Sequence, residues 1–243
     1  MNNKQNNYRL YFLITLIVVG GVLVLLLILW FIMWILQYFY KKNNPNWEME
    51  MAQLEKEKEM NKTILIVGSD GFEDVELILP RDIWMRLGYD VDIAFGTSNK
   101  YVVSGKGLEI KVKLTLKDVL ESGLSKYDAL FIPGGPGFKT LNACVELDPI
   151  IAHFVDNNKL VGAICAGPTA LAKRGYLKGK TAICHYGDEW RNALIDGGAT
   201  LSDPNCKPGQ DCQTVVDGNF VTSLTMETAF SLAYTFAEEL EKR

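Results

Sequence analysis

Short, largely apolar runs alternate with segments of helical periodicity from residue 63 onward. Such runs are typical of strands buried on both faces of a parallel sheet. They predict strands over residues 63–67, 91–95, 127–133 and 160–164, and shorter ones over 109–112, 181–184, 199–201, 214–216 and 220–222. Apolar positions at three- and four-residue spacing predict helices over residues 74–87, 116–120, 149–158 and 226–241. This alternation predicts a doubly wound α/β domain with a mainly parallel sheet over residues 63–243.

The first forty residues carry a different pattern. No charged residue occurs between Tyr11 and Tyr40, and aromatic residues stand at both ends of this segment. About 20 apolar residues are enough to cross a bilayer. We therefore expect a short polar tail (residues 1–10), one retained transmembrane helix (11–40) and a charged juxtamembrane linker (41–62). This organisation predicts a single-pass membrane protein with the lipid bilayer as a partner, while similar numbers of basic residues on both flanks leave its orientation open.

Composition and cysteine spacing exclude several classes of function. The chain has 25 basic and 29 acidic residues without a cluster of Lys or Arg, which argues against a nucleic-acid-binding surface. Its five cysteines are too scattered for a disulfide scaffold, and none has the spacing of a zinc site, so we expect no metal. Cys206 and Cys212 flank a Pro-Gly turn, which leaves two readings open: a small loop disulfide or two free thiols.

The segment around Cys165 has the features of a nucleophile elbow. A strand-like run ends at Ile164, and Gly167 and Pro168 suit a sharp turn followed by the first helical positions. A thiol at this place faces the N-terminus of a helix, which predicts a stabilised thiolate and a lowered pKa. The alternative is a small buried hydrophobic residue, as most free cysteines are.

Three loops are expected to meet beside this cysteine. In doubly wound sheets a site forms beyond the carboxyl ends of the strands. The loops over residues 68–76, 134–137 and 165–168 each follow a predicted buried strand, so we expect them to converge.

Three motifs in these loops resemble the ThiJ/PfpI superfamily. They are the segments Gly71–Pro80, Phe131–Gly135 and Ala163–Leu171, and the resemblance extends over residues 63–239. The cysteine segment is most similar to the branch that contains the Parkinson-linked protein deglycase. The resemblance implies a flavodoxin-like α/β fold, a homodimer and chemistry without a cofactor.

The resemblance also implies roles for four residues. Glu76 matches the family glutamate that hydrogen-bonds the elbow cysteine, here Cys165, and would hold its thiolate from a protonated carboxyl group. The backbone N–H groups of Gly135 and Ala166 would form an oxyanion or sulfinate cradle. The alternatives are an ordinary acid in the first turn of a helix for Glu76 and a simple tight turn for Gly134-Gly135.

The chain departs from the family at its histidines. The protease-like branch has a histidine directly after the cysteine, where this chain has Ala166, so a cysteine protease is disfavoured. The deglycase branch has a later histidine where this chain has Ala199, and its Arg-Gly-Pro-Gly loop is replaced by residues 224–227. His185 is the sole candidate base, although an imidazole with apolar neighbours more often has a structural role.

Two functions remain open, and with them the question whether this chain is an enzyme. In the first, a cysteine-dependent glyoxalase or deglycase, Cys165 attacks an α-oxoaldehyde or its adduct and Glu76 moves the proton. In the second, a redox-responsive or chaperone-like protective protein, Cys165 oxidises to a sulfinate and the signal lies in binding. A purely structural module is a third, weaker reading.

Overall fold

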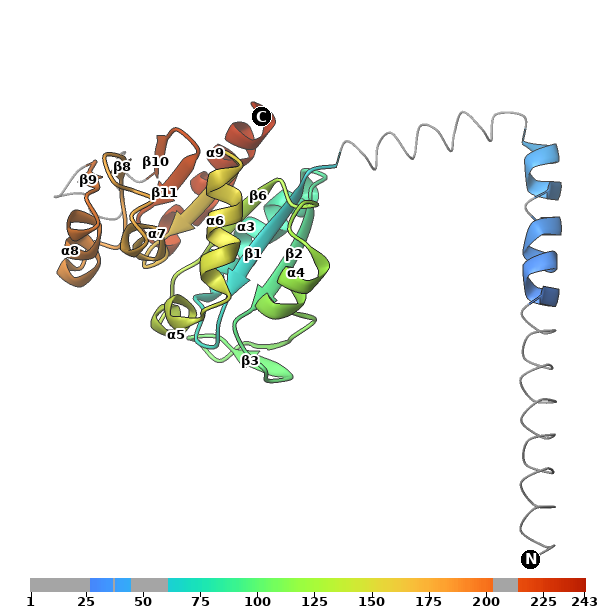
Figure 1. Ribbon diagram of the computed structural model, residues 1–243, viewed down its shortest axis with the longest axis horizontal. Helices are drawn as coiled ribbons and strands as arrows, with labels where there is room; N and C mark the ends of the chain where they lie inside the picture. The colour runs from blue at the N-terminus through green and yellow to red at the C-terminus, as the bar shows by residue number, and fades with distance from the viewer. Residues whose placement is uncertain (1–26, 37, 45–60, 203–213) are drawn as a thin grey trace, which may run out of the picture. The chain divides into compact units, whose positions relative to one another are not determined.

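The computed structural model describes residues 27–36, 38–44, 61–202 and 214–243 (Figure 1). The chain divides after Met60, and the second unit, Asn61–Arg243, carries the α/β domain. Cys206 and Cys212 lie outside the described residues, so the choice between a disulfide and two free thiols stays open there.

The expected membrane span needs a correction. In the part of the chain that the structure describes, no helix is long and apolar enough to cross a bilayer. Residues 27–36 and 38–43 are helical. Membrane localisation, as predicted from the uncharged run, is therefore contradicted. The rest of that run, residues 11–26 and 37, lies outside the described residues.

A seven-stranded sheet forms the centre of the domain. Its strand order is β10-β11-β7-β6-β1-β2-β5, and every neighbouring pair is parallel except β10 with β11. The strands are β1 (Thr63–Gly68), β2 (Asp90–Phe95), β5 (Leu114–Thr115), β6 (Ala129–Ile132), β7 (Leu160–Ile164), β10 (Thr214–Asp217) and β11 (Phe220–Ser223). The prediction of a mainly parallel, flavodoxin-like α/β domain is confirmed.

Helices cover both faces of this sheet, which is why its central strands are apolar throughout (Figure 1). In β1, Ile64 and Ile66 pack into one core and Leu65 and Val67 into the other, as the two-residue period of a strand requires. One face carries α3 (Asp74–Arg86) and α9 (Ala229–Glu241), which follows the short 3-10 helix η1 (Met226–Thr228). The other carries α4 (Leu116–Ser122), α5 (Phe138–Ala143), α6 (Leu147–Asp156), α7 (Pro168–Lys173) and α8 (Asp188–Asp196).

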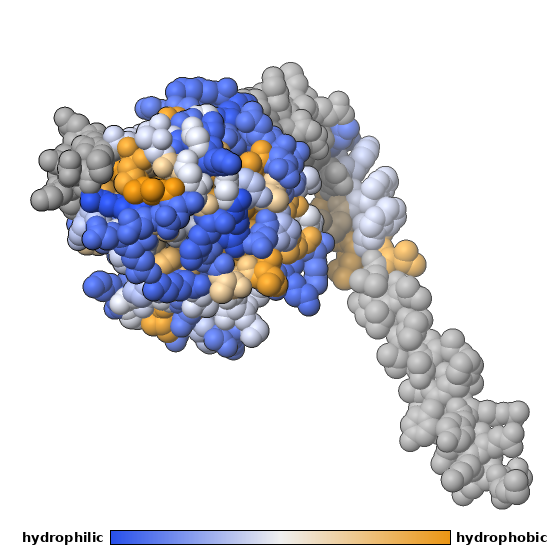
Figure 2. Space-filling model, turned by 60° about the vertical axis from the view of Figure 1, so that its left-hand side comes forward, coloured by the Kyte–Doolittle hydropathy of each residue, from blue (hydrophilic) through white to orange (hydrophobic). Residues whose placement is uncertain are grey.

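Two small sheets stand apart from the central one. β3 (Tyr101–Val103) and β4 (Glu109–Lys111) form an antiparallel hairpin, of which the sequence predicted only the second strand. β8 (Thr181–Ala182) and β9 (Thr200–Leu201) were predicted as strands, but they pair with each other in parallel and do not join the central sheet. On the face shown in Figure 2 the domain surface is mostly hydrophilic, with apolar residues in separate patches.

Strand β7, which leads to Cys165, is held by close aromatic packing at Gly162. The rings of Trp84, Phe131 and Phe236 meet above it, with the Trp84 and Phe236 centroids 4.8 Å apart. A Cβ at Gly162 would lie 2.6 Å from Phe236 Cε2 and 2.9 Å from Phe131 Cδ2. The lack of a side chain at this position therefore lets α9 approach the strand.

We predict that Gly162→Ala lowers the free energy of unfolding by about 1–3 kcal/mol, because the added methyl group must displace two packed rings. Denaturant unfolding followed by circular dichroism measures this loss. Phe236→Leu makes room for the methyl group, so the double variant should lose less than the sum of the two single variants. Additive losses, or an unchanged Gly162→Ala, would contradict this account of the packing.

Candidate active site

Three loops meet where the order of the strands reverses. In the sheet, β2 lies beside β1 on one side, and β6 followed by β7 lies on its other side. The carboxyl ends of β1, β6 and β7 are therefore neighbours. Gly137 N–H donates to Gly71 O (2.8 Å), and Glu73 N–H donates to Gly134 O (3.2 Å), which ties the loop after β1 to the loop after β6. A Cβ at Gly167 would lie 2.3 Å from Ile132 O, so the loop after β7 also packs directly on β6. The structure thus brings together the three loops that topology predicted.

Cys165 occupies a strained backbone conformation between β7 and α7. Its φ of +60° is unusual for a residue with a side chain, and among the described non-glycine residues only Asn158 shares a positive φ. The conformation is fixed from both sides, since Cys165 N–H donates to Ser223 O (3.0 Å) and His185 N–H donates to Cys165 O (2.8 Å). A nucleophile held on a sharp strand-to-helix turn is the geometry of an elbow.

The Glu76 side chain is buried against this elbow. Its residue is 1% exposed, and its Oε2 accepts a hydrogen bond from Gly134 N–H at 2.8 Å. Burial raises the pKa of Glu76 to about 7; hydrogen bonds from Gly134 and Cys165 oppose this, and the charges of Glu73 and Glu227 add to it. Glu73 also accepts from Glu76 N–H (2.8 Å) and so caps α3.

Gly134 is the point at which carboxyl, thiol and amide meet. A Cβ there would lie 2.8 Å from Ala166 N, 2.9 Å from Cys165 Cβ and 2.9 Å from Glu76 Oε2. Any side chain would therefore push these groups apart. The next residue, Gly135, is required for two reasons: its φ of +102° disfavours residues with a side chain, and a Cβ there would lie 2.3 Å from Glu73 N.

The expectation of a lowered pKa for Cys165 is wrong. Burial raises the pKa of the thiol, the Glu76 charge and hydrogen bond raise it further, and the amides of Ala166 and Gly135 oppose this only in part. Two adjacent negative charges are too costly here, so the pair still keeps one proton when the pH rises above about 7.

A cavity of about 260 Å³ opens beside Cys165 and Glu76. Its other lining residues come from loops on several strands and are Glu73, Asp74, Gly105, Lys106, Pro136, His185, Tyr186, Thr225, Met226 and Glu227. Its volume suits a small molecule or the end of a side chain rather than a large ligand.

His185 lines this cavity and also has a structural role. Its Nδ1 accepts from Gly187 N–H at 3.0 Å, and its ring stacks on Tyr186 with centroids 4.2 Å apart. Burial lowers its pKa, with Arg191 acting in the same direction and Glu227 opposing it. The imidazole is therefore neutral at pH 7, with Nε2 carrying the proton. The other histidine, His153, lies on α6 and is not among the residues that line the cavity.

Thr225, Glu227 and Asp74 also line the cavity, although the sequence did not single them out as site residues. Thr225 and Glu227 follow β11, which pairs in parallel with β7, so its end lies at the same edge as Cys165. That pairing could have identified them, but the order of the short strands was not predicted. Within the described residues, no group of three or more His, Cys, Asp or Glu side chains could hold a metal ion.

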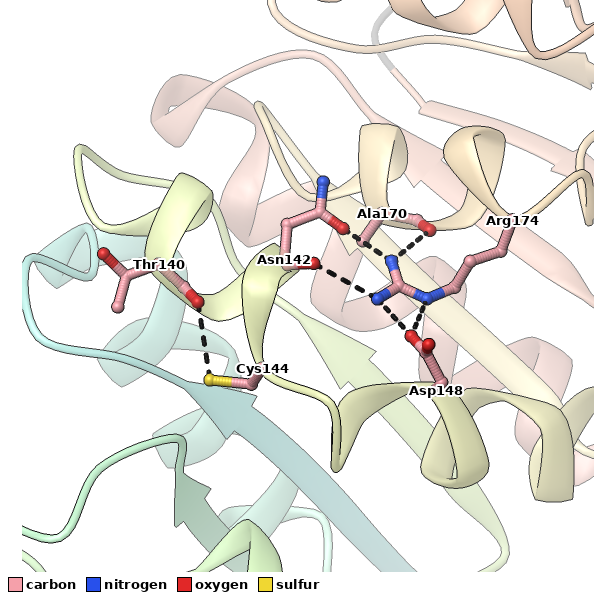
Figure 3. A network of polar contacts seen from close by, with 6 residues as sticks. All are labelled: Thr140, Asn142, Cys144, Asp148, Ala170 and Arg174. Atoms are coloured by element: carbon pink, nitrogen blue, oxygen red, sulfur yellow. Dashed lines mark hydrogen bonds and ion pairs between the residues drawn. The ribbon is translucent and has the colours of Figure 1, made fainter.

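Arg174 ties the elbow helix to the two helices that follow β6 (Figure 3). From the end of α7 its guanidinium donates to Asp148 Oδ1 (2.6 Å), Asn142 Oδ1 (2.5 Å) and Ala170 O (2.9 Å). Asn142 lies on α5 and Asp148 on α6, so one planar cation joins three helices. Cys144, whose Sγ lies 3.4 Å from Thr140 O, sits beside this network and outside the candidate site.

Comparisons with known proteins agree with this architecture. The sequence model of the DJ-1/PfpI family matches residues 62–239. The Caenorhabditis elegans protein named glutathione-independent glyoxalase DJR-1.2 is 32% identical over 178 residues, 73% of this chain and 88% of that protein. The Pyrococcus furiosus protein named deglycase PfpI is 34% identical over 161 residues, 66% of this chain and 88% of that protein. The crystal structure of Drosophila melanogaster DJ-1beta has a TM-score of 0.65 at 26% identity and covers 76% of this chain and 92% of that chain.

We predict that Glu76 makes the stability of the domain depend on pH. Its pKa rises from 4.5 to about 7 on folding, so the stabilisation from protonation is fully present below pH 4.5 and is lost as the pH rises through about 7. One unit of pKa difference corresponds to about 1.4 kcal/mol, so wild-type protein should lose about 3 kcal/mol across this window relative to Glu76→Gln. Denaturant unfolding at a series of pH values measures the difference.

Cys165→Ala is the control for this measurement, because it keeps the buried carboxyl group and should keep the pH dependence. A difference between Glu76→Gln and wild type that stays constant with pH would show that burial does not raise the pKa of Glu76.

Proposed function

This chain belongs to the DJ-1/PfpI family, and we propose that it is a cofactor-independent glyoxalase or deglycase in which Cys165 attacks a reactive carbonyl. The observation that carries the proposal is the buried Glu76 carboxyl group, packed with Cys165 and the Ala166 amide around Gly134. The ThiJ/PfpI resemblance is confirmed at the level of the family. Two relatives bear the names glyoxalase and deglycase, which supports the same chemistry here.

The first step joins the thiol to the aldehyde carbon of an α-oxoaldehyde. Glu76 takes the proton of Cys165 as sulfur bonds to carbon, and the Gly135 and Ala166 amides donate to the oxygen that gains charge. A carboxyl group with a pKa of about 7 is suited to this transfer, because it can both accept and return a proton at neutral pH. The product is a hemithioacetal on Cys165.

The second step moves hydrogen within the bound adduct. Removal of the proton from the former aldehyde carbon and its return to the neighbouring carbon convert the hemithioacetal into a thioester of a 2-hydroxy acid. Glu76 is placed to carry this proton. His185, the candidate base from the sequence, is less suited to this step, because its Nδ1 already accepts from Gly187 N–H. Water then hydrolyses the thioester, which frees Cys165 and balances the reaction as methylglyoxal plus water giving lactate.

A cysteine protease fits the site less well. Ala166 follows Cys165, so no imidazole stands next to the nucleophile in the chain. The Nδ1 atom of His185 already accepts a hydrogen bond from Gly187 N–H, so its lone pair is not free to accept a proton from the nucleophile. The redox-responsive alternative uses the same cradle, with Glu76 and the amides of Gly135 and Ala166 holding a Cys165 sulfinate.

The direct test is lactate formation from methylglyoxal by the full-length protein. Cys165→Ser should lose at least about 100-fold in kcat/KM, and Glu76→Gln about 10²–10⁴-fold, as expected for loss of a nucleophile and of an acid–base group. Cys144→Ser, which changes a thiol outside the cavity, is the matched control and should keep wild-type turnover. Absence of lactate with wild-type protein, or turnover that survives in Cys165→Ser, would refute the enzyme.

We further propose that the chain forms a homodimer. The β3–β4 hairpin region leaves Tyr101, Val103 and Leu108 42–44% exposed, an apolar surface that a second copy could cover. Wild-type protein should sediment as a dimer at micromolar concentration, and Val103→Asp should shift it toward monomer. A wild-type monomer would contradict this proposal.

A further inference from the structure

The candidate cavity is lined by more acidic than basic side chains. Glu73, Asp74, Glu76 and Glu227 face one lysine, Lys106. The salt bridges that the structure shows among residues 61–202 and 214–243 involve none of these five side chains. The cavity therefore has an excess of negative charge that no ion pair within the described residues neutralises.

Glu227 brings this charge close to the reacting groups. It lies in η1 at the exposed mouth of the cavity, where the Thr225 hydroxyl donates to its carboxylate. Its charge raises the pKa of Glu76 and opposes the lowering of the His185 pKa, so its field reaches both groups. Arg191 acts on His185 in the opposite direction but does not line the cavity.

Asp74 adds an unused hydrogen-bond acceptor to the same wall. Its Oδ1 accepts from the Ser104 hydroxyl at 2.7 Å, whereas its Oδ2 is buried without a hydrogen-bond partner in the described structure. A cationic group bound in the cavity would offset the charge of this carboxyl group, which no ion pair in the described structure neutralises. An ammonium or guanidinium group supplies both the donor and the opposite charge.

From these observations, and resting on the proposed function, we propose that the site prefers carbonyl compounds bearing a positive charge over anionic ones, and that Glu227 is its specificity-determining residue. The cationic end lies toward Glu227 and Asp74 while the carbonyl carbon faces Cys165. An anionic oxoacid would meet four carboxyl groups and bring no N–H donor. The cavity volume of about 260 Å³ also limits the size of the carbonyl compounds that can bind, in addition to this selection by charge.

Labelling of Cys165 with charged reagents tests the proposal without requiring turnover. Full-length protein is treated with methanethiosulfonates carrying a trimethylammonium or a sulfonate group, and the rate at Cys165 is followed by peptide mass spectrometry. The ratio of the cationic to the anionic rate is divided by the same ratio for a free thiol. The thiolate fraction of Cys165 enters both rates equally, so the ratio isolates the charge of the surroundings.

We expect this normalised ratio to be about tenfold above one at low ionic strength and to fall in 0.5 M salt, because Glu227 is exposed and screened. Glu227→Gln should lower it about threefold or more, and Asp74→Asn should lower it independently. Glu146→Gln, a loss of the same charge beside Cys144 and away from the cavity, should leave the ratio at Cys165 unchanged.

A wild-type ratio near one, or a ratio that Glu227→Gln does not change, would overturn the charge selection. Failure of the proposed enzyme is distinguishable from this result. Wild-type protein that makes no lactate but shows the expected ratio would keep the charge selection as a binding property, while turnover with a ratio near one would keep the enzyme and reject the selection.

Discussion

The buried carboxyl group of Glu76 can be accommodated only if three separate loops meet around it. It needs a donor from the loop after β6, the Gly134 amide at 2.8 Å, and it packs with the thiol that follows β7. These contacts are possible because Gly134 has no side chain. The raised pKa of Glu76 is the consequence of this burial, and the shared proton between Glu76 and Cys165 is what the chemistry of the site depends on.

Contacts outside the site hold Glu76 and Cys165 in place. Strand β7 is fixed by the rings that pack on Gly162, and the positive φ of Cys165 is held by backbone bonds to Ser223 and His185. Arg174 joins α7 to α5 and α6, so the elbow helix cannot shift without breaking bonds to two other helices. Strain at the cysteine is thus maintained by contacts that lie outside the site.

The sequence predicted the layers of the domain because buried parallel strands are apolar throughout, as in residues 63–67 and 160–164. The rule that sites in doubly wound sheets form beyond the carboxyl ends of the strands predicted the convergence of the loops around Cys165. The sequence analysis named Glu76 as the partner of Cys165 but did not predict the raised thiol pKa, because its largest cause is the burial of the thiol, which only the packed loops determine. Glu227 was missed since its place follows from the pairing of β11 with β7, and the uncharged run over residues 11–40 led to a membrane span that the described residues contradict.

The central claim, that Cys165 and Glu76 share one proton, is tested most directly by the pH dependence of Cys165 alkylation with iodoacetamide. The account predicts a rate that rises with a midpoint near pH 7, the apparent pKa of the pair, and then stays level to about pH 9. Replacing Glu76 by Gln should remove this step and leave a single rise at higher pH. A wild-type profile that rises only above pH 8, with the same shape in Glu76→Gln, would contradict the account.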